Sequence, residues 1–157
     1  MINDPDGSVN NTYPDEDTRV YGVRPNGVGT NSVLTPSPGG GEENYEDVDE
    51  SIPDGDTTHV QGSANGDKDT YACSDIPVDV TVKGVSVVSM SKLSVVGAED
   101  VRRVALYNGN YTYIAGRGTL IATEYRRYSG VLEEAPGGGA WTPARVNSAE
   151  FGAEIAV

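Results

Sequence analysis

The chain has 157 residues, of which 36% are hydrophobic, enough for one domain with a core once a polar N-terminal part is set aside. Its 24 acidic and 11 basic side chains give a formal net charge of -13, which argues against nucleic acids and anionic membranes as partners. No stretch approaches the ~18 apolar residues of a membrane helix, and the first residues lack the pattern of a secretion signal, so we expect synthesis in the cytoplasm.

The charge is divided unevenly along the chain. Residues 1–79 carry 17 acidic and 3 basic side chains, whereas residues 80–157 carry 7 and 8. A basic protein surface would therefore suit the N-terminal half as a partner. Cys73 is the only cysteine, so no internal disulfide is expected and this residue is interpreted as a small apolar side chain.

Residues 1–41 are dominated by Gly, Pro, Asn, Asp, Ser and Thr, and such a composition buries too little apolar area to fold alone. We expect an extended, non-globular arm that a partner orders, the alternative being a flexible spacer. Residues 18–23 have β-forming character and could add a strand to a partner's sheet edge. The expected contact residues of the arm are Arg19, Val20, Tyr21, Val23, Val33 and Leu34.

Residues 42–157 are expected to form the folded domain. Residues 57–61 and 69–73 are predicted strands, separated by a turn at 65–67. The alternating valines of residues 78–82 predict a half-buried strand, and Gly84 then interrupts the period as a bulge would.

Asn108-Gly109 is flanked by β-forming residues and predicts a tight hairpin over residues 104–114. Further strands are expected over residues 119–124, 125–132 and 151–157, with a turn at 135–139. Thr142 as N-cap and Pro143 at the first helical position predict a short helix before the last strand. About seven to nine strands at this spacing indicate an all-β fold, an antiparallel β-sandwich or jelly roll.

The residues do not predict a catalytic, cofactor or metal site. His59 is the only histidine and has no evident base, nucleophile or metal partner in the sequence. Aspartates two apart could supply oxygen ligands to Ca²⁺, but the EF-hand pattern is absent and solvated turns are favoured. These aspartates are Asp47, Asp49, Asp54, Asp56, Asp67 and Asp69.

Nine tyrosines stand against one Phe and one Trp. Those in the predicted strands stabilise a sheet through cross-strand pairs, or build a contact face for a protein or a glycan. The doublets at residues 102–103 and 126–127 each direct one arginine outward, and Arg103 and Arg127 are expected to meet acidic arms of neighbouring copies.

Residues 45–50 (YEDVDE), 53–58 (PDGDTT) and 66–71 (GDKDTY) resemble a group of tailed-bacteriophage virion structural proteins. Residues 140–142 (AWT), 146–147 (VN) and 151–152 (FG) are similar to the closing segment of that group, with its tyrosine strand at residues 125–128. The arm lies outside the resemblance, and the strand between the motifs is shorter and richer in valine here. The resemblance implies a β-sandwich on a phage particle and implies no catalytic residues.

We therefore expect a virion protein that decorates and cements the outer surface of the head, since an inner surface would face DNA and favour basic residues. The expected partners are the major capsid protein or another virion protein, and copies of the chain itself, a trimer by analogy with capsid symmetry. The alternative is a tail, neck or fibre component whose sandwich binds a host receptor. No enzyme activity is expected.

Overall fold

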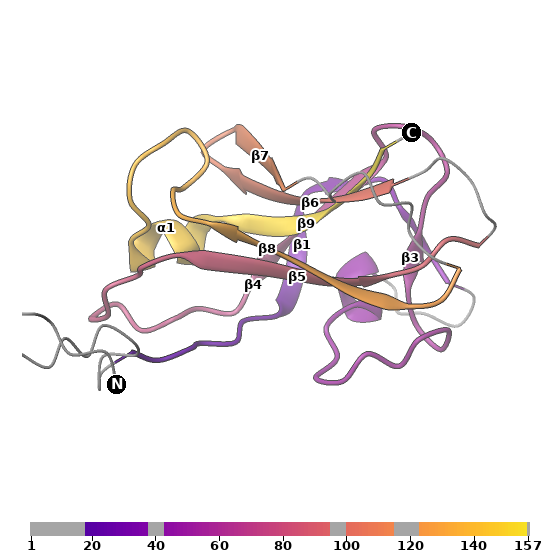
Figure 1. The fold of residues 1–157 in the computed structure, drawn as a ribbon, viewed down its shortest axis with the longest axis horizontal. Helices are drawn as coiled ribbons and strands as arrows, with labels where there is room; N and C mark the ends of the chain where they lie inside the picture. Colours follow the sequence, from indigo (N-terminus) through magenta and orange to yellow (C-terminus); the bar gives the residue numbers. More distant parts are fainter. Residues whose placement is uncertain (1–17, 38–42, 95–99, 115–122, 157) are drawn as a thin grey trace, which may run out of the picture.

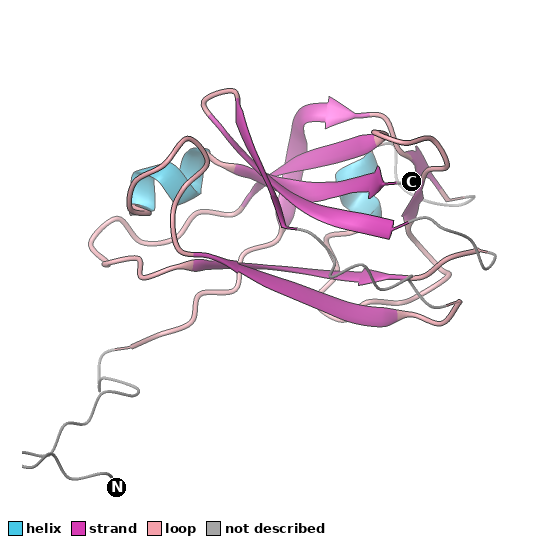
Figure 2. Ribbon diagram, turned by 45° about the horizontal axis from the view of Figure 1, so that its top comes forward, coloured by secondary structure: helices cyan, strands magenta, loops and turns pink. Residues whose placement is uncertain are grey.

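The described part of the chain folds into two facing layers of antiparallel strands, which confirms the expected all-β sandwich. The computed structural model describes residues 18–37, 43–94, 100–114 and 123–156. The larger layer is a five-stranded sheet, in the order β1 (Pro25–Ser32), β4 (Lys68–Cys73), β9 (Glu150–Ala156), β6 (Asp100–Tyr107) and β7 (Asn110–Ile114). The smaller layer is a two-stranded ribbon of β5 (Val85–Ser91) and β8 (Arg126–Leu132) (Figures 1 and 2).

Four short elements complete the fold. The strands β2 (Thr35–Pro36) and β3 (Val60–Gln61) pair with each other, and the 3-10 helix η1 (Asn44–Asp47) lies between them in sequence. The helix α1 (Pro143–Ser148) begins as the sequence predicts, because the Thr142 side chain accepts a hydrogen bond from the backbone N–H of Arg145. Pro143 lacks a backbone N–H, which costs nothing at the first helical position because an N–H there has no partner within the helix.

The main core lies between the sheet and the ribbon. Trp141 is its largest member, and its indole N–H donates to the carbonyl of Leu132 at 3.1 Å while its ring lies 6.1 Å from that of Phe151. The buried residues come from both layers, from α1 and from the loops that connect them: Ile76, Val87, Ala105, Leu132, Ala135, Trp141, Val146, Ala149 and Phe151. The Asn147 side chain ties α1 to the chain before the ribbon, through hydrogen bonds to both backbone groups of Ile76.

The hairpin of β6 and β7 is the feature that the sequence predicts best. Asn108 and Gly109 have φ angles of 48° and 75°, as a two-residue turn with positive φ requires. Tyr107 and Asn110 face each other directly across the turn. The turn at residues 135–139 and the last strand, β9, are confirmed as well.

The five-stranded sheet curls so that its two edges meet over its outer face. β1 and β7 are the outermost strands, yet the Asn31 side chain donates to the hydroxyl of Tyr111 at 3.1 Å. Val104 and Leu106 face away from the ribbon and are nevertheless 0% and 5% exposed, because they lie beneath this closure. The curl gives the sheet a second, smaller core of its own.

Two predicted strands and one predicted bulge differ from the structure. Residues 78–82 form no strand: Val80 and Val82 pack against the core from an irregular segment, while Val78 is exposed. β5 begins directly after Gly84 and pairs with β8 in continuous register, so there is no bulge at this glycine. The strand expected over residues 57–61 shrinks to β3, and most of the one expected over 119–124 lies outside the described residues.

The expected boundary between an arm of residues 1–41 and a domain of residues 42–157 is wrong for residues 25–37. β1 pairs with β4 along the edge of the sheet, with irregular steps in its register. Its Gly29 is needed because a Cβ there would lie 2.1 Å from the carbonyl oxygen of Thr70. Gly29 permits the close approach of β1 to β4, and the Asn31 side chain donates to the Thr70 hydroxyl, so the polar composition of this segment does not indicate an arm.

Candidate functional site

Residues 18–24 form an extended segment that leaves the sandwich at the start of β1 (Figures 1 and 2). Its root is fixed, because Val23 packs against the core and the backbone of Arg24 exchanges hydrogen bonds with Ser74. Beyond this root Val20 is 95% exposed and Tyr21 is 41% exposed. Of the expected arm contacts, Arg19, Val20 and Tyr21 are therefore free for a partner, whereas Val23 is half-buried in its own domain.

Val33 and Leu34, the second expected anchor, belong to the domain itself. The buried carboxylate of Asp69 accepts hydrogen bonds from the backbone N–H groups of Val33 and Leu34 at 2.6 and 2.8 Å. Leu34 is 7% exposed, so its side chain is not available to a partner, which corrects the expectation. Val33 keeps an exposed side chain on a backbone that is tied to β4.

The same Asp69 carboxylate joins three elements. Its second oxygen accepts from the side-chain amide of Asn44 in η1 at 2.6 Å and from the Tyr71 hydroxyl at 3.0 Å. Asn44 also donates to the carbonyl of Leu34. Burial, together with the charge of Asp69, raises the pKa of Tyr71, so this tyrosine stays a donor.

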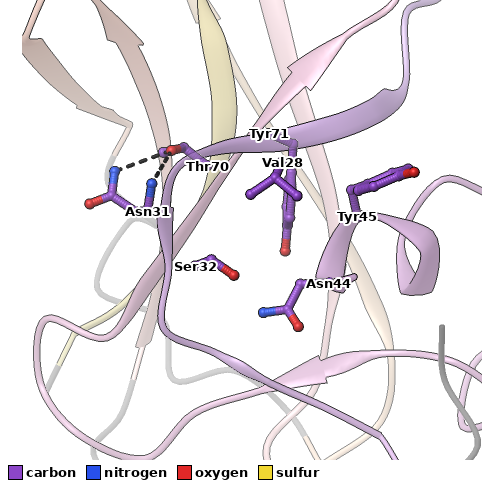
Figure 3. Close-up of a pocket in the computed structure, with 7 residues that line it drawn as sticks. All are labelled: Val28, Asn31, Ser32, Asn44, Tyr45, Thr70 and Tyr71. Atoms are coloured by element: carbon purple, nitrogen blue, oxygen red, sulfur yellow. Dashed lines mark hydrogen bonds between the residues drawn. The ribbon is translucent and has the colours of Figure 1, made fainter. Parts of the chain in front are cut away.

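The hollow beside this network is not a binding pocket. Figure 3 shows it between β1, β4 and η1, and it leaves no room for the centre of a water molecule. It is lined by Val28, Asn31, Ser32, Asn44, Tyr45, Thr70 and Tyr71. We therefore interpret this region as a structural joint.

The two arginine doublets are oriented differently from each other. Arg103 is 2% exposed, with its guanidinium 5.9 Å from the ring centre of Tyr128 and one N–H donated to the carbonyl of Ile114. It points toward the ribbon, because residues of β6 that alternate with it, such as Ala105, line the core. Arg102 is the outward member, so the expected role of Arg103 in contacting a partner is wrong, whereas Arg127 is exposed on the ribbon.

The outer face of the β5–β8 ribbon is the apolar surface that the sequence analysis missed. Val88, Met90 and Val131 are 46%, 42% and 67% exposed there. The register places Val88 opposite Ser129 and Met90 opposite Arg127, so this face carries no acidic side chain. Strand alternation counted from Val85, the first residue of β5, would have indicated it.

The tyrosines do not form one contact face. Tyr111 and Tyr113 stack at 6.1 Å on the outside of β7, and the ammonium of Lys68 lies 5.0 Å from the first ring centre. Lys68 also pairs with Glu154, a contact that raises the pKa of this lysine. Tyr125 instead donates to Gly55 and Asp56, and burial with the Asp56 contact raises its pKa to about 12.

The structure corrects the expectation of solvated aspartates at two positions, because Asp47 and Asp69 are buried. Within the described ranges, no three His, Cys, Asp or Glu side chains gather as a metal ion would need. His59 is half-buried and its backbone pairs with Ser37. Burial raises the pKa of the Cys73 thiol to about 11, so it stays protonated at neutral pH.

No family model, curated protein or solved structure matches this chain. In the described residues, no helix combines the length and the apolar character needed to cross a bilayer. The described residues offer a partner several exposed surfaces, among them the segment at residues 18–22 and the outer face of the ribbon.

Proposed function

We propose that this chain is a virion structural protein of a tailed bacteriophage, which decorates the outer surface of the head and cements the shell. The observation that carries the proposal is the segment of residues 18–22, which is extended and exposed while its root is fixed to a small sandwich. A sandwich that sits on a shell can use such a segment to bind a neighbouring subunit that the sandwich itself does not touch. The segment then links the two subunits.

The charge supports a position on the outside of the head. A net charge of -13 is repelled by packaged DNA, whereas an outer surface imposes no such penalty. The protein would be made in the host cytoplasm and bind the assembled shell, through the major capsid protein or another virion protein. A ligand that binds only the assembled shell shifts the equilibrium away from disassembly.

One observation favours a second function. The exposed, stacked pair of Tyr111 and Tyr113 resembles a surface that could pack against a glycan or a receptor. In that case the protein would belong to the tail, neck or fibre and would recognise the host.

The test compares particles with and without this protein. The cement function predicts labelled copies over the whole head in electron micrographs, and a lower temperature of heat-triggered genome release when the protein is missing. Copies at one end of the particle, with an unchanged release temperature and reduced host adsorption, would instead establish the receptor-binding function.

A further inference from the structure

The backbone of residues 18–22 makes no hydrogen bond to the described part of the chain, although the segment is extended and contains β-forming residues. Its side chains are Thr18, Arg19, Val20, Tyr21 and Gly22, with no acidic group among them. An extended, unpaired backbone with exposed Val and Tyr has the properties of a strand that lacks a sheet.

The β5–β8 ribbon has the complementary property. Within the described ranges, β5 pairs with β8 alone, so its other edge carries backbone donors and acceptors without a strand beside them. A ribbon of two strands is the weakest kind of sheet, and a third strand would stabilise it. The exposed Val88 and Met90 lie on β5, next to that edge.

We infer that residues 18–23 of one copy add to the free edge of β5 in a second copy, antiparallel to β5. Val20 then lies beside Val88 on the outer face of the ribbon, and both lose exposed apolar surface. The contact brings no carboxylate against another, because neither the segment nor the ribbon contains an acidic residue, although the chain has 24.

The charges at the two ends of the ribbon determine the direction. Asp15, Glu16 and Asp17 directly precede the segment. Exposed Arg126 and Arg127 lie opposite Ser91 and Met90 at one end of the ribbon, whereas Glu133 and Glu134 follow β8 at the other. Antiparallel addition brings the three acidic residues toward the arginines, and parallel addition would bring them toward the glutamates.

The segment does not reach the ribbon of its own copy, because its root is fixed at Val23 and Arg24, from where the chain runs away from its own sandwich (Figure 2). The free edge of β5 and the arginines that match the acidic residues both belong to this chain, so the occupant is a second copy. Each copy then donates one strand and accepts another, a head-to-tail contact that closes into a ring or continues as a chain. The inference deepens the proposed function, since it names the partner of the same segment, and its test is done without particles so that either can fail alone.

The first experiment mixes full-length chains that carry one cysteine each, in a Cys73→Ala background. Opposed residues on antiparallel strands have the Cα separation of a disulfide, so Thr18→Cys mixed with Met90→Cys should form a covalent pair of two chains under oxidation. Thr18→Cys mixed with Ser86→Cys is the matched control for the parallel direction and should not. Preferential pairing with Ser86→Cys would overturn the stated direction.

The second experiment measures self-association by sedimentation velocity. The native chain should form concentration-dependent species, and Val20→Pro should raise the dissociation constant at least about tenfold, because proline removes a backbone donor and disfavours strand pairing. Val20→Thr keeps the backbone donor and a β-branched side chain, and should associate nearly as the native chain does. A monomer at every concentration, or a Thr18→Cys/Met90→Cys chain that crosslinks only within itself, would overturn the inference.

Discussion

Asp69 is fully buried, and its carboxylate accepts four hydrogen bonds that hold Val33, Leu34, Asn44 and Tyr71 together. Asp69→Asn replaces an acceptor oxygen with a donor that faces other donors. We expect it to lower the free energy of unfolding by about 2 kcal/mol, the usual cost of leaving buried polar groups unsatisfied. Chemical denaturation measures this change, and hydrogen exchange should show faster exchange at the amides of Val33 and Leu34.

The control for this change is Asp49→Asn, since Asp49 is exposed and the same substitution there should stay within about 0.5 kcal/mol of the native chain. Equal effects at the two positions would contradict the structural role of Asp69.

Glu150 joins β9 to its neighbour β4 and to the edge strand β1 on the outer face of the sheet. Its carboxylate accepts hydrogen bonds from the Thr70 hydroxyl and from the backbone and hydroxyl of Thr30, at 2.6 to 2.7 Å. Partial burial acts to raise the pKa of Glu150, but these hydrogen bonds outweigh it and hold the pKa below the ordinary value of 4.5.

Because the pKa of Glu150 is lowered by folding, its charged form stabilises the fold above the ordinary pKa, and this stabilisation is lost as pH falls through the folded value. Glu150→Gln should therefore be less stable than the native chain at pH 7, by about 1 kcal/mol for a partly exposed group. The difference should disappear between about pH 4.5 and pH 2. Unfolding curves across this range test it, with exposed Glu133→Gln as the control, and a gap that widens in acid would contradict it.

Sequence predicts individual residues well where their role is local. The Asn108-Gly109 turn and the Thr142 cap are recognisable because the backbone there demands particular residue types. Asp69, Leu34 and Arg103 could not be placed, because their burial depends on which strands lie over them. The sequence did contain one indication that Asp69 is buried, because this residue alternates with Tyr71 and Cys73 and therefore shares their face of the strand.

At the scale of elements, the position of β1 changes what truncation should do. Removing residues 1–22 leaves Val23, Arg24 and every described strand in place. That shortened chain should stay soluble and melt cooperatively, within a few degrees of the full chain. Removing residues 1–41 deletes β1 and β2, takes two donors from Asp69 and opens the edge of β4.

We expect the longer truncation to lose its cooperative transition or to aggregate, since an open edge and an uncompensated buried carboxylate both penalise the fold. Thermal scans by circular dichroism compare the two truncations. If the longer one melted as sharply and at as high a temperature as the shorter, β1 would be dispensable and the boundary expected from composition would be right after all.

The strands differ in how visible they are to pattern reasoning. β6, β7 and β9 combine β-forming residues with a clear turn or cap beside them, and their prediction is confirmed. β1 reads PNGVGTNS and is defined by pairing with β4, which composition does not reveal. The valines of residues 78–82 alternate as a strand would, but they reach the core from a segment without a ladder partner.

At the scale of the whole molecule, two adjacent stretches near the N-terminus attract a partner in two different ways. Residues 15–17 are all acidic, whereas residues 18–23 contain no acidic residue, so one part attracts through charge and the next through backbone pairing and apolar contact. The fold class followed from the sequence because strand spacing is a global pattern. The sequence did not show where on a partner these two stretches bind, because that depends on the surface of the partner.

Binding of the protein to particles that lack it should therefore have a salt-sensitive and a salt-resistant part. Between 0.1 M and 1 M salt the Debye length falls from about 10 Å to about 3 Å, which screens the acidic residues but leaves strand pairing intact. Replacing Asp15, Glu16 and Asp17 by their amides should lower affinity at 0.1 M salt and have little effect at 1 M. Val20→Pro should remove the binding that remains at 1 M, because that binding relies on strand pairing between neighbouring copies on the shell, and co-sedimentation of labelled protein with particles measures both. Affinity that rose with salt, or a Val20→Pro chain that bound at 1 M as the native chain does, would show that the segment does not pair as a strand on the particle.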